Sequence, residues 1–145
     1  MLSHYATNKM QDWFYRGQTW SLPANFYIAL CTTTCTQAAM GTEVTGGSYA
    51  RIALPRTLTD ISGTQGQGTT VASSGTSGTI YNNNAIAMGT PTVAWGTVQS
   101  AVLMDAVTGG NMLEYYNFPT PKQIVNVGDP VELPQFFFVS TLTSS

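Results

Sequence analysis

The chain has 145 residues, enough for one domain with a core of its own, and 43% of them are hydrophobic. Only 8% are charged, against about 25% in a typical soluble domain, while aromatic residues reach 11%. The aromatic content excludes a disordered chain, and the scarcity of Lys and Glu is typical of surfaces that pack against other subunits. We therefore expect a single domain spanning residues 1–145 that forms a homo-oligomer, a trimer or a dimer.

Charge and hydropathy exclude two classes of partner. The formal net charge is −2, and the five basic residues are scattered, too few for the roughly six to ten phosphate contacts of a typical nucleic-acid site. No run approaches the roughly 18 apolar residues of a membrane span. Because the N-terminal segment MLSHYATNKMQDW lacks the apolar core of a signal peptide, we expect synthesis in the cytoplasm without secretory export.

Residues 3–16 carry the only strong helical pattern. Ser3 precedes the helix as an N-cap, and Gly17 follows it where helices commonly end. A helix with this aromatic content must pack on something, either as a lid on its own sheet or as an arm on a neighbouring subunit. The apolar side chains that recur on one helix face are those of Leu2, Tyr5, Ala6, Met10, Trp13 and Phe14.

The rest of the chain has the pattern of short strands separated by Gly, Pro and Asn turns. Residues 25–31 are apolar on both alternating faces, which predicts a central strand covered on both sides. The pattern as a whole predicts an all-β fold, a single-domain antiparallel β-sandwich or jelly-roll-like fold with one N-terminal α-helix. The other predicted strands span residues 48–54, 79–87, 97–106, 111–118, 122–127 and 131–142.

The segment 56–79 is a long polar loop. Residues 62–79 read SGTQGQGTTVASSGTSGT, which has too little apolar surface to offset the entropy cost of ordering it. We expect either a mobile surface loop or an arm that a partner orders.

The stretch GTEVTGGSYARI, residues 41–52, raises the question of a phosphate-binding loop. Such a loop needs a helix after its glycines, and its nucleotide-binding form also needs a Lys. Here a predicted strand follows Gly46-Gly47 and no Lys is near, so we interpret the pair as a turn that needs positive φ. Arg51 is expected to pair with Glu43 and hold this loop.

Catalytic signals are weak, and we expect no enzyme activity and no cofactor. The single histidine, His4, lies at the start of the helix, far in sequence from any nucleophile it could activate. Asp105 and Glu114 flank the TGG turn and would be the pair for a sugar-cleaving enzyme. Asp105 is better explained as a cap for the backbone N–H groups of that turn.

Cys31 and Cys35 stand in the segment CTTTC. Three interpretations remain open: free thiols packed as small hydrophobes, a disulfide, or part of a metal site. A zinc site would need two further ligands at suitable spacing, and the chain has one His.

Several short motifs in one order resemble a family of small virion proteins of tailed bacteriophages, over roughly residues 3–142. Its members are labelled tail fibre proteins or head decoration (cement) proteins. The resemblance implies a β-rich fold, a structural role in the virion and no enzyme activity. The motifs are Tyr5 with Asn8-Lys9, Pro23-Ala24, residues 27–32 (YIALCT), residues 41–44 (GTEV), residues 46–51 (GGSYAR), residues 95–98 (WGTV), Asp105, residues 109–113 (GGNML), Lys122 and residues 127–129 (VGD).

The leading expectation from the resemblance is a capsid decoration protein, which binds the outside of the phage head and clamps neighbouring copies of the major capsid protein. The alternative is a tail fibre or tail-tip protein that recognises a host surface. The chain departs from the family pattern in its long polar loop, its CTTTC segment and the PQFFF run near the C-terminus. The expected interface residues are Trp13, Phe14, Trp20, Phe136, Phe137 and Phe138, and the 62–79 arm is a further expected clamping surface.

Overall fold

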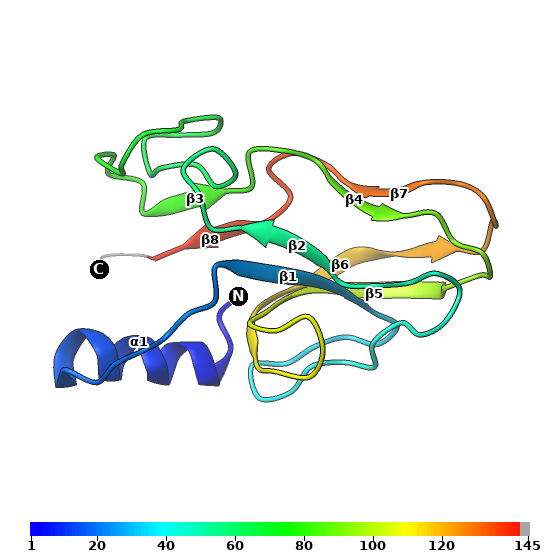
Figure 1. Ribbon diagram of the computed structural model, residues 1–145, viewed down its shortest axis with the longest axis horizontal. Coiled ribbons are helices and arrows are strands. Elements are labelled where there is room, and N and C mark those ends of the chain that lie inside the picture. The colour runs from blue at the N-terminus through cyan, green and yellow to red at the C-terminus, as the bar shows by residue number, and fades with distance from the viewer. Residues whose placement is uncertain (143–145) are drawn as a thin grey trace.

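A computed structural model describes residues 1–142 (Figure 1). One helix is followed by eight strands, and no peptide bond within the described residues is cis. The elements are α1 (His4–Arg16), β1 (Asn25–Cys31), β2 (Ile52–Pro55), β3 (Thr79–Tyr81), β4 (Ile86–Gly89), β5 (Gly96–Met104), β6 (Met112–Ile124), β7 (Val131–Leu133) and β8 (Val139–Thr141).

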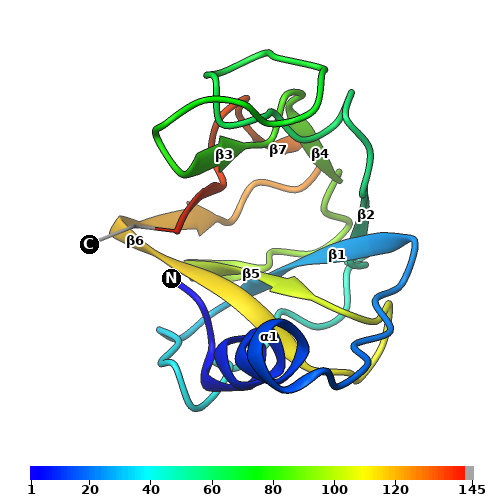
Figure 2. The same ribbon diagram turned by 90° about the vertical axis from the view of Figure 1, so that its left-hand side faces the viewer.

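The strands form two layers, as Figure 2 shows. One layer is a four-stranded antiparallel sheet in the order β2-β1-β5-β6. The other consists of two antiparallel pairs, β3 with β8 and β4 with β7. The predicted all-β sandwich with an N-terminal helix is confirmed. The more specific jelly-roll expectation is not confirmed, because a jelly roll has eight strands in two larger sheets.

Strand β1 is central, as predicted, and both of its faces are covered. Ile28 and Leu30 point into the core between the two layers, together with Val98, Trp95 and other buried residues. Ala29 and Cys31 point the other way and pack with Val102, Met104 and Met112 in a second, smaller cluster. A strand buried on both sides has no polar face, which is why its sequence is a continuous apolar run.

Helix α1 has the predicted caps. The Ser3 hydroxyl accepts a hydrogen bond from the Ala6 N–H, and Gly17 ends the helix in the left-handed conformation with φ 65°. Residues 1–3 lie along β6, since Ser3 N–H donates to Leu113 O and Tyr115 N–H donates to Met1 O. This pairing places the start of α1 against the chain's own sheet, and the helix then extends past the end of that sheet (Figure 1).

Two predicted strands are in fact broken. Residues 79–87 form β3 and β4, which belong to different sheets, and residues 131–142 form β7 and β8. The side chain of buried Asn82 explains both breaks: it donates to the carbonyls of Asn84 and Pro134 and accepts from the Phe138 N–H. Phe136 lies in the turn between β7 and β8 with φ 61°. The expectation that residues 136–138 lie within one strand over 131–142 is therefore wrong.

Two predicted strands are in fact one. Residues 111–118 and 122–127 were expected to flank a turn at Pro119-Thr120-Pro121, but β6 runs through these residues. Val98 pairs with Lys122 and Ser100 pairs with Asn117, so residues 118–121 bulge opposite a single residue of β5. Proline cannot donate to a sheet ladder, and a bulge on an edge strand is where it is tolerated.

Strand β2 begins later than predicted, at Ile52 instead of residue 48, because the turn of Gly46 and Gly47 continues through Ser48, which has φ 62°. The interpretation of the glycine pair as a turn is confirmed, with φ 76° at Gly46 and 57° at Gly47. Both cysteines are free and buried.

The polar loop is held by hydrogen bonds within the chain. Thr69 Oγ1 accepts from the Gly63 N–H, Gln65 Nε2 donates to the Ala72 carbonyl, and Asn83 Nδ2 donates to the Thr69 carbonyl. The hydroxyls and amides that give this segment its low hydropathy therefore replace a hydrophobic core as the source of its order. The expectation of a loop that is either mobile or ordered by a partner overlooked this possibility.

Candidate binding groove

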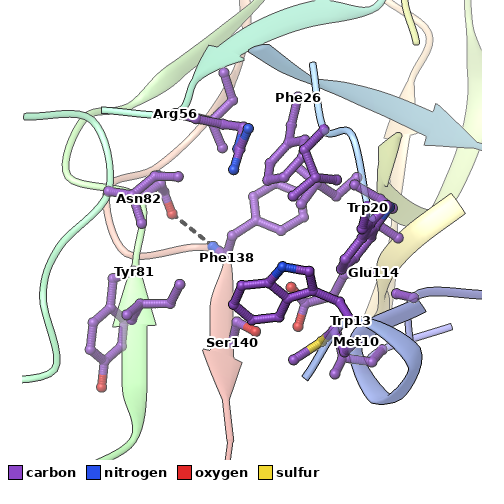
Figure 3. Close-up of a pocket in the computed structure, with 18 residues that line it drawn as sticks. Met10, Trp13, Trp20, Phe26, Arg56, Tyr81, Asn82, Glu114, Phe138 and Ser140 are labelled. Carbon is purple, nitrogen blue, oxygen red and sulfur yellow. Dashed lines mark hydrogen bonds between the residues drawn. The ribbon is translucent and has the colours of Figure 1, made fainter. Parts of the chain in front are cut away.

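An apolar groove of about 510 Å³ lies at the end of the sandwich where α1 extends past the sheet (Figure 3). Its walls come from parts of the chain that are far apart in sequence: α1, the segment after it, the start of β1, the end of β2, and the strands β3, β5, β6 and β8. The labelled residues around it are Met10, Trp13, Trp20, Phe26, Arg56, Tyr81, Asn82, Glu114, Phe138 and Ser140.

Large aromatic side chains dominate the groove. Trp13 reaches it from α1 and is 58% exposed, while Trp20 reaches it from the segment between Gly17 and β1. Phe26 and Phe138 close it from the sheet side, and Phe138 is buried. Concave, largely apolar sites with few polar groups are the usual shape of binding sites in proteins.

Some polar groups of the groove already have partners. The Asn82 amide is used in its three hydrogen bonds to backbone groups. Arg56 lies over the ring of Phe26, 5.0 Å from the ring centroid, and its Nη1 donates to the Pro23 carbonyl. The groove therefore offers mainly apolar surface and one cation–π pair, and its Asn82 amide is already engaged.

Glu114 is the carboxylic acid in the groove lining, and the whole residue is 8% exposed. Burial raises the pKa of its carboxyl, and the N-terminal ammonium group and the Ser140 hydroxyl oppose that rise. The ammonium nitrogen of Met1 lies 3.6 Å from Glu114 Oε1. A buried carboxyl of this kind costs stability when it is charged.

An exposed aromatic ridge adjoins the groove on α1. It consists of Trp13, Phe14 and Tyr15, which are 58%, 70% and 79% exposed. Trp13 belongs to both features, since it also lines the groove. Neighbouring rings of the ridge lie in contact, with Phe14 and Tyr15 edge to face at 4.9 Å between centroids.

The six expected interface residues do not form one surface. Trp13, Trp20 and Phe138 line the groove, and Phe14 lies on the ridge. Phe137 instead packs edge to face with Tyr116 and Phe118 and lines a second hollow beside β6 and β7. Phe136 contacts Tyr81. The run of three phenylalanines is thus divided among three environments because the chain turns at Phe136.

The residues that carried the weak catalytic signals do not share one site in the structure. Both oxygens of the Asp105 carboxylate accept from Asn111, one from its backbone N–H and one from its side-chain amide, so Asp105 caps its turn as predicted. Glu114 instead lines the groove, which Asp105 does not. The backbone N–H of His4 donates to the Gln37 carbonyl. Within residues 1–142, no cluster of three or more His, Cys, Asp or Glu side chains could hold a metal ion.

The sequence identified the tryptophans of the groove and missed Phe26 and Arg56, and it singled out Glu114 only as a possible catalytic partner of Asp105. The signal for Phe26 and Arg56 was an apolar side chain at the start of β1 and an arginine directly after β2. Neither feature is unusual by itself, and only the pairing of β1 with β2 places Phe26 opposite Leu54.

No helix among the described residues has the length and apolar character needed to cross a membrane. No curated protein matches the sequence. The model of one protein family, described as podophage GP4 fiber I protein gp80, matches residues 1–136. This match covers most of the chain and confirms the resemblance to virion proteins of tailed phages. The chain therefore belongs to the podophage GP4 fiber I protein gp80 family and is a bacteriophage virion structural protein.

Proposed function

We propose that this chain is a subunit of a phage tail fibre, that it acts by binding and not by catalysis, and that it self-associates through the groove and the aromatic ridge. The description of its family as a fiber protein favours the fibre over the head decoration role that the sequence resemblance put first. The observation that carries the proposal is a hollow of about 510 Å³ beside a helix that exposes three consecutive aromatic side chains, one of which lines the hollow.

A surface that offers both a hollow and projecting side chains can complement a second copy of itself, which is the requirement for a symmetric dimer contact. Burying the exposed parts of Trp13, Phe14 and Tyr15 would remove roughly 300–500 Å² from water, given about 150–250 Å² for each aromatic side chain. A standard interface buries about 800 Å² on each partner. The ridge alone would supply about half of that area, and the groove lining would add to it.

The chemistry of the groove favours a protein partner over a sugar. A saccharide site needs free hydrogen-bonding groups around its aromatic platforms, and here Asn82 is fully engaged with backbone groups. Arg56 and Glu114 each have a partner as well. Protein interfaces are enriched in aromatic side chains and depleted in charged ones, as this surface is.

The second candidate is capsid decoration, in which many copies bind the major capsid protein on the outside of the head. One observation favours it: the described residues form a compact sandwich without repeats or shaft-forming strands. A protein that binds only the assembled shell stabilises that shell through linkage. Decoration and fibre roles require different numbers of copies, which makes them separable.

The copy number in purified virions, measured by quantitative mass spectrometry against the major capsid protein, tests the choice. A few to a few tens of copies would support the fibre, whereas on the order of hundreds, as icosahedral symmetry requires, would replace it with decoration. Absence from the particle would contradict both.

Self-association has its own test, the mass of the purified protein in solution by light scattering. We expect the wild-type protein to be an oligomer. The substitutions Trp13→Ala and Trp20→Ala should each shift it toward monomers. Leu58→Ala is the matched control, because Leu58 is also exposed, at 55%, and does not line the groove. A monomeric wild-type protein, or equal effects of all three changes, would contradict the assigned surface.

A further inference from the structure

The two buried cysteines both lie next to Ser100. Cys31 ends β1 and lies directly opposite Ser100 of β5 in the antiparallel register. The Cys35 thiol donates to Ser100 Oγ across 3.4 Å. Directly paired residues of antiparallel strands project on the same face of the sheet, so both sulfurs lie on the face that carries Val102 and Met104.

Both cysteines are held where they are. Cys31 lies within the central strand and is fully buried. The main chain of Cys35 is fixed by Asn117 of β6, whose side chain accepts from the Cys35 N–H and donates to the Cys35 carbonyl, each at 2.9 Å. The three threonines between the cysteines therefore close a small loop whose two ends are anchored to the same sheet.

The surroundings of Cys35 favour its thiolate. The neighbouring Cys31 thiol lowers the pKa of Cys35, although burial opposes this, and the Gly41 N–H donates to the Cys35 sulfur across 3.2 Å. The same contact with Cys35, together with burial, raises the pKa of Cys31. These contacts favour Cys35 over Cys31 as the sulfur that loses its proton first, an asymmetry typical of cysteines that exchange with disulfides.

We propose that Cys31 and Cys35 are a disulfide-forming pair, reduced when the chain is made and oxidised later by a small disulfide such as oxidised glutathione. The Cys35 thiolate attacks one sulfur of the small disulfide, forms a mixed disulfide and releases one thiolate. Cys31 loses its proton and attacks the Cys35 sulfur, which forms the protein disulfide and releases the second thiolate. Two protein thiols are oxidised, and the small disulfide is reduced to two thiols that take up the two protons.

The bond would tie the segment 32–43 to the sheet. This segment meets the start of α1, where the His4 N–H donates to the Gln37 carbonyl, and it carries Glu43. Because Cys35 is only 3% exposed, the attack requires this segment to open. Oxidation would therefore be slow, and it would then hold the segment closed in the oxidising medium that a virion meets outside the cell.

The test is incubation of the purified, folded protein with oxidised glutathione, followed by intact mass measurement and peptide mapping after alkylation. We expect the wild-type chain to lose the mass of two hydrogen atoms and to yield a peptide with Cys31 linked to Cys35. Cys31→Ala should stop at the mixed disulfide on Cys35, and Cys35→Ala should remain reduced for longer than the wild-type protein.

Phenylarsine oxide bridges two neighbouring thiols and provides a second measurement. It is made on the wild-type protein, so it does not depend on whether a cysteine variant folds. One equivalent should bind to the wild-type protein and protect both cysteines from alkylation. The proposal would be overturned by a stable glutathione adduct on wild-type Cys35, by disulfides between chains, or by two free thiols after a treatment that oxidises the urea-unfolded chain.

Discussion

Arg51 holds Glu43 in a two-point contact, with Nε 2.8 Å from Oε1 and Nη2 2.8 Å from Oε2. The remaining nitrogen, Nη1, donates to the carbonyls of Ala106 and Gly109, each at 2.8 Å. The Arg51 side chain is only 7% exposed. One guanidinium therefore joins the segment before the Gly46-Gly47 turn to the turn after β5, and the predicted pairing of these two residues is confirmed.

Replacing Arg51 by Lys should destabilise the protein by about 2 kcal/mol. A lysine keeps the charge but loses the paired geometry, and it leaves carbonyls and a carboxylate oxygen without donors. Urea unfolding followed by tryptophan fluorescence would measure the change. Arg16→Lys is the control, because the Arg16 pair with Asp12 is solvent-exposed and should be worth less than about 0.5 kcal/mol. Equal effects of the two changes would contradict the role of Arg51.

The Glu43 pair should make stability depend on acid pH. Burial alone would raise the pKa of Glu43, but the hydrogen bonds and charge of Arg51 and the Tyr49 hydroxyl outweigh it and lower the pKa below 4.5. A depressed folded pKa means that the contribution is present above pH 4.5 and is lost as pH falls through the folded value. Urea unfolding between about pH 6 and about pH 3 should show the advantage of the wild type over Glu43→Gln shrinking with acid. An unchanged difference would contradict the assignment.

Glu114 should show the opposite sign. Its folded pKa is raised above 4.5 by burial, so its contribution is present below pH 4.5 and is lost as pH rises through the folded value. Relative to the wild type, Glu114→Gln should therefore gain unfolding free energy as pH increases through this window. The same urea experiment measures it, and Glu43→Gln serves as the variant with the reverse trend. If the two variants showed the same trend with pH, burial in the groove would not raise the pKa of the Glu114 carboxyl.

The two glycines of the turn should respond differently to alanine. Both have positive φ, which costs a residue with a Cβ about 1–2 kcal/mol. A Cβ at Gly46 would meet no atom within 4 Å, whereas one at Gly47 would overlap Val93 Cγ2 and lie 3.0 Å from the Val93 N and O. Gly47→Ala should therefore destabilise clearly more than Gly46→Ala in thermal unfolding. Adding Val93→Ala should restore only part of the loss, because the backbone contact remains.

Local patterns predicted the elements whose stabilising partners lie close in sequence. The helix depends on Ser3 and Gly17 at its ends, and the turn depends on Gly46 and Gly47. The Glu43–Arg51 contact joins residues eight positions apart on either side of that turn. Each of these features depends on backbone conformations that particular side chains favour, so each is visible in a short stretch of sequence.

Strand boundaries and the groove depended on distant partners. Asn82 breaks two predicted strands because its side chain satisfies backbone groups as far away as Pro134 and Phe138. In β6 the pairing with β5 on both sides of the bulge carries the chain through two prolines that would end an isolated strand. Pairing across a sheet outweighs local propensity in both cases.

The sequence by itself determined the class of fold, the helix, the strand with two buried faces and the kinship with phage virion proteins, because composition, periodicity and motif order are properties of the chain alone. Only the tertiary structure decided which aromatic side chains share a surface. Trp13, Phe26, Glu114 and Phe138 come from segments far apart in the sequence, and they meet because burial of the core brings the strands and the helix together.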